Sequence, residues 1–289
     1  VFVTDENYDA GDALTFCSEA SLTIEIPEVL PLTINDIITS DYNGYGVQCY
    51  GEENGFINIS VLGGTGVYTY SWFDENNEQI NTLSTSSISN LPPGSYTVTV
   101  TDQNFDIMGS NIGQGCDVTQ TIILTEPIEL EISDFTISDY DGFGVTCGGE
   151  QDGFIDITVS GGVGNYTFFW SNDEITEDIF NIGSDVYTVI VTDENSCSVT
   201  LDFEIFESEP LQISATYSDY SGFGISCNAE TDGFIDITVS GGSGIYTYDW
   251  SNGSITEDLT NLESGTYTVI VSDSNGCETS TTYVLNQPE

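Results

Sequence analysis

The chain has 289 residues, of which 48 are Asp or Glu and none is Lys, Arg or His, so its formal net charge is −48. This composition excludes a His general base, a Schiff-base Lys and an arginine clamp for phosphate, and we expect no enzymatic activity. It also disfavours nucleic acid and anionic membrane surfaces as partners, because no basic patch can form.

The chain nevertheless has the content of a folded protein. Apolar residues make up 38% of it and aromatic residues 12%, and they alternate with polar residues, which acidic disordered chains do not show. No segment approaches the roughly 18 continuous apolar residues of a membrane helix, so membrane insertion is not expected. The acidic residues are spread evenly, which predicts a solvated outer surface.

One sequence unit occurs three times, after the end of a fourth copy. The octapeptide DGFIDITV stands at 152–159 and 232–239, and NGFINISV stands at 54–61. Each is followed by Gly-Gly, by Tyr-Thr and by a Trp. The predicted domains are the C-terminal part of a truncated repeat (1–27), a repeat with two loop insertions (28–127) and two further repeats (128–210 and 211–289).

Three anchor residues set the register of the copies: a first Cys, a Trp and a second Cys. The first Cys and the Trp are 23 residues apart in every copy (49 to 72, 147 to 170, 227 to 250). The copy at 28–127 is longer after its Trp, with insertions of 7 residues around 74–87 and 10 residues around 103–115. Both insertions are polar and rich in Gly and Asn, which predicts loops, where extra length costs little.

The last copy shows the predicted strands best. Apolar residues alternate with polar ones in five segments: 211–215, 235–239, 246–250, 267–271 and 279–285. This period of two indicates half-buried strands, and Gly or Asn-Gly pairs between them supply turns. Six or seven short strands in about 80 residues predict an all-β fold of tandem immunoglobulin-like β-sandwiches. The predicted core aromatic residues are Trp72, Trp170, Trp250, Tyr96, Tyr187 and Tyr267.

The cysteines predict disulfides in an oxidising compartment. One Cys precedes the inward Ile-rich strand of each copy and another precedes the closing strand. We expect one bond within each repeat, which would stabilise a domain too small to be stable alone. The expected pairs are Cys49–Cys116, Cys147–Cys197 and Cys227–Cys277, with Cys17 paired to a cysteine outside these residues. Zinc is the rival interpretation, but the chain has no CxxC pair and no His.

The repeats follow one another without a flexible linker. Pro127, Pro210 and Pro288 each follow an acidic or amide residue, and the first two precede a new strand. No Gly/Ser-rich segment separates the copies, which indicates stiff connections. Units of roughly 35 Å predict an elongated rod of about 100 Å for three repeats.

The segment DGFIDITVSGGSGIYTYDWSNGSITEDLTNLESGTYTVIVSDSNGC, residues 232–277, resembles the repeat of the SprB family. The shared pattern is Cys, DG, a short strand, GG, YTY-x-W-SNG, NL-x-x-G-x-Y-T-V-x-V-x-D and NGC. The pattern fits 147–210 and 227–289 well, 49–127 with its two insertions, and 1–27 as a fragment. The resemblance therefore covers nearly the whole chain.

The SprB family comprises gliding-motility adhesins of the Bacteroidota, exported by type IX secretion. The resemblance implies a segment of a secreted extracellular filament, associated with the outer membrane at the bacterial cell surface. It implies a structural stalk that holds an adhesive tip off the cell and transmits force. The implied partners are the gliding and secretion machinery, external surfaces or polysaccharide contacted by the parent protein, and other filaments through self-association.

One recurring segment does not match that family pattern. The motif S-D-Y-x-G-[FY]-G precedes each first Cys, at 40–46, 138–144 and 218–224. One interpretation is a structural loop whose Tyr packs on the sandwich end or on the neighbouring copy. The other is a calcium site, because carboxylate and carbonyl oxygens are the ligands of hard cations. The candidate ligands are Asp41, Asp139, Asp141, Asp152, Asp219 and Asp232; no other cofactor is expected.

A second function remains open, in which the repeats themselves bind glycan or protein on a non-motile surface protein. The aromatic stripes could stack on sugars, but their strand-period alternation with polar residues favours the core. Paired carboxylates could serve a glycosidase, but every acidic residue lies on a repeated surface and no unique cleft is indicated.

Overall fold

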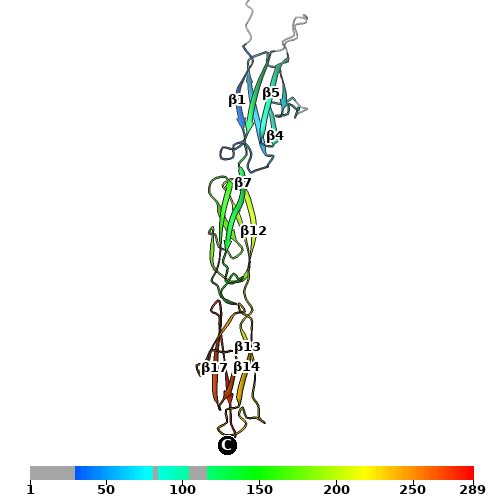
Figure 1. Cartoon of the computed structure of the whole chain (residues 1–289). Helices are drawn as coiled ribbons and strands as arrows, with labels where there is room; N and C mark the ends of the chain where they lie inside the picture. Colours follow the sequence, from blue (N-terminus) through cyan, green and yellow to red (C-terminus); the bar gives the residue numbers. More distant parts are fainter. Residues whose placement is uncertain (1–29, 81–83, 104–115) are drawn as a thin grey trace, which may run out of the picture. The chain divides into compact units, whose positions relative to one another are not determined.

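The computed structural model describes residues 30–80, 84–103 and 116–289, and these residues are all-β (Figure 1). They form no helix that is long and apolar enough to cross a membrane. They belong to two compact units. The first holds the described residues up to Asp41 together with Glu52–Thr125, and the second holds Tyr42–Gly51 together with Glu126–Glu289.

Each of the three copies contributes six strands. In the first copy they are β1 (Thr33–Thr39), β2 (Gly55–Leu62), β3 (Tyr68–Phe73), β4 (Ser87–Leu91), β5 (Gly94–Asp102) and β6 (Asp117–Leu124). In the second they are β7 (Ile128–Ile137), β8 (Gly153–Gly162), β9 (Thr167–Trp170), β10 (Ile179–Ile182), β11 (Asp185–Thr192) and β12 (Ser198–Ile205). In the third they are β13 (Gln212–Tyr217), β14 (Gly233–Ser240), β15 (Tyr246–Trp250), β16 (Leu259–Leu262), β17 (Gly265–Asp273) and β18 (Glu278–Leu285).

The strands of every copy form two antiparallel three-stranded sheets with the same topology. In the third copy the orders are β13-β14-β16 and β15-β17-β18, and the other copies repeat them. Two such sheets with a shared apolar interior make an immunoglobulin-like β-sandwich, which confirms the predicted fold class. The strand β16 and its counterparts β4 and β10 were not among the segments predicted from alternation, because they have only four or five residues.

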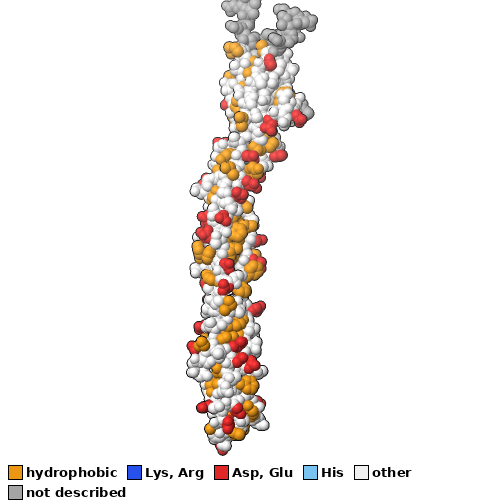
Figure 2. All heavy atoms as spheres, viewed as in Figure 1, with side chains coloured by type: hydrophobic (Ala, Val, Ile, Leu, Met, Phe, Trp, Pro, Cys, Tyr) orange, Lys and Arg blue, Asp and Glu red, His pale blue; other side chains and the backbone are white. Residues whose placement is uncertain are grey.

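Alternation decides which face of each strand is buried. Along β14, Ile235 and Ile237 are buried, whereas Phe234 between the glycine and the first Ile is 38% exposed. Apart from the buried Asp102, Asp193 and Asp273, acidic side chains lie mainly on the outer faces. Figure 2 shows them scattered among polar and apolar side chains instead of gathered in one patch. The charge is therefore carried as a solvated surface, as the even spacing of the acidic residues predicts.

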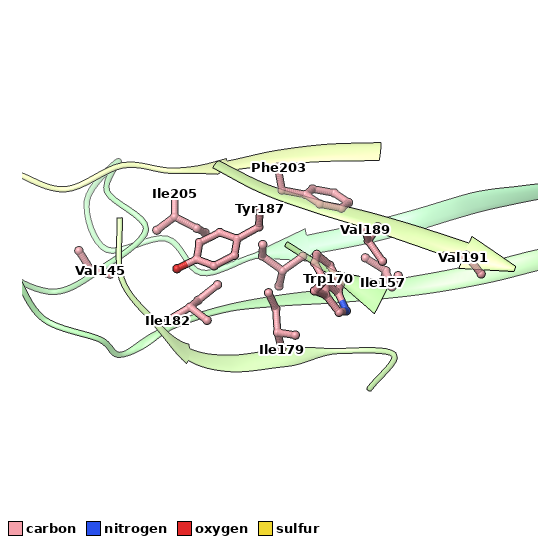
Figure 3. Packing of buried hydrophobic residues seen from close by; sticks show 11 residues of the cluster. Val145, Ile157, Trp170, Ile179, Ile182, Tyr187, Val189, Val191, Phe203 and Ile205 are labelled. Carbon is pink, nitrogen blue, oxygen red and sulfur yellow. The ribbon is translucent and has the colours of Figure 1, made fainter. Parts of the chain in front are cut away.

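A fully buried Trp lies at the centre of each sandwich. In the second copy Trp170 lies among Ile157, Ile179 and Val189, with the ring of Phe203 at a centroid distance of 5.9 Å (Figure 3). Trp72 and Trp250 occupy the same place in the other two cores. Tyr96 and Tyr187 are buried and Tyr267 is half-buried against its cluster.

The indole N–H of each Trp donates to a backbone carbonyl, so this buried donor is satisfied. The acceptors are Thr176 for Trp170 (2.9 Å) and Thr256 for Trp250 (2.9 Å), six residues later in both cases. In the first copy the acceptor of Trp72 is Thr85, thirteen residues later (3.0 Å). The seven-residue insertion therefore lies between the Trp and its acceptor, and the core contact is kept.

The segment N-L-x-x-G-x-Y, which reads N-I-G-S-D-V-Y in the second copy, has a structural explanation in each copy. Its Asn has a positive φ (57° at Asn261), and the ladder between β16 and β14 shifts register there. Asn tolerates this left-handed conformation better than most residues. The Tyr hydroxyl donates to the carbonyl four residues upstream, Tyr187 to Gly183 (3.1 Å) and Tyr267 to Glu263 (3.0 Å). These bonds are corners of the immunoglobulin type.

Candidate functional site

The cysteines pair between consecutive copies. Cys49 is bonded to Cys197 with an S–S distance of 2.06 Å, and Cys147 is bonded to Cys277 with an S–S distance of 2.13 Å. The first Cys of one copy thus bonds to the second Cys of the next. The predicted pairs within repeats, Cys49–Cys116, Cys147–Cys197 and Cys227–Cys277, are therefore wrong. Cys17 lies outside the described residues.

The length of one strand explains why a pair within a repeat cannot form. Cys147 lies in the loop before the ten-residue strand β8, and Cys197 lies in a turn beside the far end of that strand. There Asp193 accepts a hydrogen bond from the N–H of Val163 at 2.9 Å. Ten residues of strand span about 33 Å, whereas bonded cysteines need Cα atoms within about 7 Å. The two cysteines of a repeat therefore lie at opposite ends of its sandwich.

We call residues 138–152 and 218–232 the first-cysteine loops; residues 42–51 form the corresponding segment ahead of β2. Each contains a two-residue hairpin turn with positive φ at both central residues: Asn43-Gly44, Asp141-Gly142 and Ser221-Gly222. Paired backbone bonds close the turn, between Tyr140 and Phe143 at 2.7 and 3.1 Å in the second copy. Gly in the second position permits this turn, which explains the Gly that ends Y-x-G in every copy.

Polar contacts fix the rest of the first-cysteine loop of the second copy. The Ser138 hydroxyl donates to the carbonyl of Gly144 (2.5 Å) and accepts from the N–H of Phe154 (3.0 Å). After the turn, Val145 is fully buried and belongs to the core cluster. The N–H of Gly149 donates to the carboxylate of Glu207 at 2.7 Å. The loop is therefore held at its start, at its middle and at its tip.

The six predicted calcium ligands do not converge. Among the described residues no group of three acidic or Cys side chains is placed to hold a metal ion. Asp41 occupies the position in the first copy that Asp139 and Asp219 occupy in the others. Each of the remaining five accepts a hydrogen bond: Asp139 from Gly142 (2.8 Å), Asp219 from Gly222 (2.6 Å), Asp152 from Thr146 (2.5 and 3.1 Å), Asp232 from Ser226 (3.2 Å) and Asp141 from Ser274 (2.7 Å).

These bonds give the aspartates a structural role in the loop. Asp139 and Asp219 cap the hairpin turn, and Asp152 and Asp232 hold the residue that precedes the first Cys. The hydrogen bonds that Ser226 donates, its side chain first, hold the pKa of Asp232 below its ordinary value. The interpretation of the motif as a structural loop therefore accounts for these carboxylates.

We call residues 193–197 and 273–277, each with the sequence Asp-x-Asn-x-Cys, the second-cysteine turns. In the third copy one carboxylate oxygen of Asp273 accepts from the N–H groups of Asn275 (3.0 Å) and Cys277 (2.9 Å). The other accepts from the N–H of Ser243 (2.9 Å). Asp273 is 7% exposed. This buried carboxylate shapes the turn and aims Asn275 and Cys277 outward.

The second-cysteine turn of the third copy docks on the first-cysteine loop of the second. The Asn275 side-chain amide donates to the carbonyl of Tyr140 at 3.0 Å. The Cys277 sulfur, which carries no hydrogen in the disulfide, contacts the carbonyl oxygen of Thr146 at 3.1 Å. With the hydrogen bond that Ser274 donates to Asp141, the turn makes three contacts around this one disulfide.

The same docking occurs one copy earlier. The Asn195 side-chain amide donates to the carbonyls of Tyr42 (3.2 Å) and Gln48 (3.0 Å). The Asn195 side-chain oxygen accepts from the Asn43 amide (2.6 Å), and its backbone carbonyl accepts from the Gln48 amide (2.7 Å). Asn195 is 7% exposed, so its polar groups are buried and satisfied by the docked segment.

Asn195 and Asn275 are functional residues that the sequence reasoning missed. Their signal was present, because D-x-N-x-C ends ten residues after the core Tyr in both the second and the third copy. Asn275-Gly276 was interpreted as a turn only. The cysteine spacing misled as well, because the interval within the second and third copies is a constant 50 residues, whereas the bonded pairs are 148 and 130 residues apart.

The two remaining described cysteines, Cys116 and Cys227, are free thiols and both are exposed. Cys227 is the first Cys of the third copy and Cys116 is the second Cys of the first copy.

Three comparisons place the chain among known proteins. The family model described as SprB repeat matches residues 47–77, 145–174 and 225–255, so each match starts two residues before a first Cys. No curated protein matches the chain.

Solved structures match the chain at low sequence identity. The eight N-terminal Ig domains of Down Syndrome Cell Adhesion Molecule match at 13% identity and a TM-score of 0.29; 83% of this chain and 34% of that chain are covered, so this chain spans about a third of its length. The insect immune protein hemolin matches at 9% identity and a TM-score of 0.28, covering 82% and 96%. A tetra-tandem repeat in the extending region of a large adhesion protein matches at 13% identity and a TM-score of 0.24, covering 87% and 72%.

Proposed function

We propose a function from one premise, that the chain is a SprB-type repeat protein. The repeats are a structural segment of a large secreted bacterial adhesin. They hold an adhesive part of the parent protein away from the cell and transmit force along the chain. The chain itself carries no catalytic role in this proposal.

The observation that supports this proposal is the disulfide between consecutive copies. Cys147–Cys277 connects a loop at the start of one sandwich's β8 to a turn beyond the end of β17 in the next. A load that reaches the first-cysteine loop therefore has a covalent route into the following sandwich. A bond within a repeat would protect only its own domain, whereas this pairing resists separation of neighbours as well.

The acidic surface supports the same role. A formal net charge of −48 with no compensating base makes neighbouring chains repel one another and repels an anionic cell surface. The absence of Lys and Arg also leaves trypsin-like proteases without a site. Both properties suit a segment that is displayed outside the cell.

The cellular context of the proposal follows the family resemblance. The parent protein is exported by type IX secretion, is associated with the outer membrane and is moved by the gliding machinery. External surfaces or polysaccharide are bound by the parent protein elsewhere, and filaments associate with one another.

Single-molecule pulling between the chain ends tests the force-bearing role. With both bonds closed, the shortest covalent path runs along residues 1–49, back along 197–147 and out along 277–289. That path has roughly 110 residues and extends to about 390 Å, against about 1,000 Å for the reduced chain. A Cys147→Ser variant leaves one bond and extends to about 490 Å.

The pulling experiment has a clear contrary result. If the oxidised chain extends as far as the reduced chain at the same force, the bonds do not carry load and the force-bearing role is wrong. The reduced wild-type chain serves as the matched control, because its sequence is unchanged.

A binding role for the repeats is the second candidate, and exposed aromatic rings favour it. Phe169 is 53% exposed and Phe180 is 59% exposed, although both lie on strands. Exposed rings can stack on sugars. A glycan array probed with the oxidised chain separates the candidates, because a stalk segment should bind nothing and a lectin should bind a defined glycan class. Phe180→Ala provides the control for any signal.

Motility is tested on living cells with an antibody fragment raised against this chain. A label that travels along the cell body supports a gliding adhesin, whereas a label that stays in place indicates a static stalk. In the second case the gliding machinery is removed from the proposal and the force-bearing test still applies.

A further inference from the structure

The first-cysteine loop of the third copy has the same shape as the two that are occupied. Tyr220 and Phe223 pair through backbone bonds of 2.6 and 3.3 Å, and Ser221 and Gly222 have positive φ. The Ser218 hydroxyl donates to the carbonyl of Gly224 at 2.6 Å, as Ser138 does in the second copy. The loop is thus formed before any partner docks on it, and its ordering adds little to the cost of binding.

What distinguishes this loop is its exposure. Tyr220 is 40% exposed, Phe223 is 39% exposed and Cys227 is an exposed free thiol. Their counterparts in the second copy, Tyr140, Phe143 and Cys147, are only partly exposed beneath the docked turn. The third loop therefore presents two aromatic rings, one thiol and the outward carbonyl of Tyr220 on one surface.

We propose that this surface, residues 218–227, is the docking site for the Asp-x-Asn-x-Cys turn of a further SprB-type repeat that follows in the same polypeptide. In both occupied cases the occupant is the turn of the next copy, and its Asn side chain reaches the carbonyl of the first Tyr of the loop. The incoming Asn binds the carbonyl of Tyr220 and the incoming Cys bonds to Cys227. This inference rests on the two docked pairs and holds whether or not the array acts as a stalk.

The bond requires an oxidant, and a low-molecular-weight disulfide such as oxidised glutathione supplies it. The Cys227 thiolate attacks oxidised glutathione and releases one glutathione thiolate, which takes up the proton from Cys227. The incoming Cys thiolate then attacks the mixed disulfide at the Cys227 sulfur and releases the second glutathione, which takes up the other proton. Two thiols are oxidised and one glutathione disulfide is reduced to two glutathiones.

The test extends the full chain with a second copy of residues 211–289. After refolding in a glutathione buffer we expect Cys227 bonded to the added equivalent of Cys277, found by mass spectrometry of digested, unreduced protein. Alkylation of Cys227 should fall at least about tenfold relative to the original chain. Exchange of the added turn's Asn for Ala should slow bond formation about tenfold, because the docked turn loses the hydrogen bond that orients its cysteine toward Cys227.

Three results would overturn the proposal. One is equal alkylation rates of Cys227 and Cys116 in the extended chain, when Trp fluorescence shows that the added copy has folded and buried its Trp. Another is a bond from Cys227 to a second molecule, which would make another copy the occupant. The third is absence of Cys147–Cys277 itself from the same digest.

A second measurement covers failure of the added copy to fold. The original chain is incubated with a peptide of residues 271–280 carrying glutathione on its cysteine. We expect the peptide to bond to Cys227 faster than to Cys116, and the Asn→Ala peptide to lose the preference. Equal rates at both thiols would overturn the proposal.

Discussion

The side-chain amide of Asn275 donates a 3.0 Å hydrogen bond to the backbone carbonyl of Tyr140, 135 residues earlier in the chain. Asn275 precedes Cys277 by two residues, so this bond and the disulfide to Cys147 lie side by side. The amide therefore orients the turn in which the cysteine is presented to its partner.

Asn275→Ala should weaken this docking by about 0.5–1.5 kcal/mol, the net contribution of one hydrogen bond, because the Tyr140 carbonyl keeps only its bond from the N–H of Phe143. The readout is the rate at which dithiothreitol reduces Cys147–Cys277, which should rise. Cys49–Cys197 in the same molecule should be reduced at its original rate. Asn252→Ala serves as a control, since Asn252 bonds only within its own exposed turn; a uniform change at both disulfides would contradict the prediction.

The pairing between copies is directly measurable. Because the chain has no Lys or Arg, glutamyl endopeptidase replaces trypsin for digestion of the unreduced protein. We expect linked peptides that contain Cys49 with Cys197 and Cys147 with Cys277. Cys147→Ser should release Cys277 as a new alkylatable thiol and leave Cys197 protected. Release of Cys197 instead would mean that Cys147 pairs with Cys197, within the repeat.

Ala229 occupies a left-handed position where the other two copies have Gly. Its φ is 64°, against 86° at Gly149 and 72° at Gly51. A left-handed conformation raises the free energy of a non-Gly residue by about 1 kcal/mol relative to Gly. Ala229→Gly should therefore stabilise the third copy by about that amount. Gly149→Ala is the reciprocal control and should destabilise by a similar amount, since nothing lies within 4 Å of the added methyl.

Thermal unfolding of the two variants measures this prediction. Opposite shifts of melting temperature support the backbone explanation. A destabilising effect of both changes would instead mean that Ala229 makes a favourable contact through its methyl group.

Gly242 and Gly244 separate backbone strain from steric clash. Both have positive φ, 63° and 86°, so substitution by Ala introduces backbone strain at either position. A methyl group at Gly242 would lie 2.5 Å from the carboxylate of Asp273, whereas one at Gly244 has open space. Gly242→Ala should therefore cost about 1–3 kcal/mol more in unfolding free energy and accelerate reduction of Cys147–Cys277. Equal effects in the two variants would rule out the clash.

Alkaline pH should destabilise the sandwiches through their buried tyrosines. Burial raises the pKa of Tyr187 above its ordinary value of 10.0, with repulsion from Asp185 adding to it. The folded state thus favours the neutral phenol, and the stabilisation is complete below pH 10 and is lost as pH rises through the folded pKa. Denaturant unfolding at pH 8 to 11, with tyrosinate absorbance, measures this. Tyr187→Phe should reduce the fall in unfolding free energy at alkaline pH. An unchanged pH profile in this variant would exclude Tyr187 as the cause of that fall.

Much of the fold could be predicted because it is local. Alternation at Ile235 and Ile237 identifies a strand, and the fixed interval from first Cys to Trp250 identifies the repeat. The strand β16 was missed because four residues are too few for a period of two to appear. Its place depends on the left-handed Asn261 and on pairing with β14, which are tertiary properties.

The site could be predicted only in part. The recurring S-D-Y-x-G motif was recognised as unexplained, and packing of its Tyr on a neighbouring copy was one of the interpretations. The cysteine pairing was not predictable from spacing, because the 50-residue interval from Cys147 to Cys197 does not show whether the two cysteines lie at the same end of the sandwich. Only the separation of the two ends of β8 decides between them.

The offset pairing sets an order in time. A first-cysteine loop cannot close its bond until the last strands of its successor have folded, because Cys147 waits for a residue 130 positions later. When the N-terminus is made first, the first cysteine of each repeat can therefore form its disulfide only after the next repeat has folded. As the chain grows, the first cysteine of the newest folded repeat stays a thiol, while the first cysteines of the repeats before it can already be bonded.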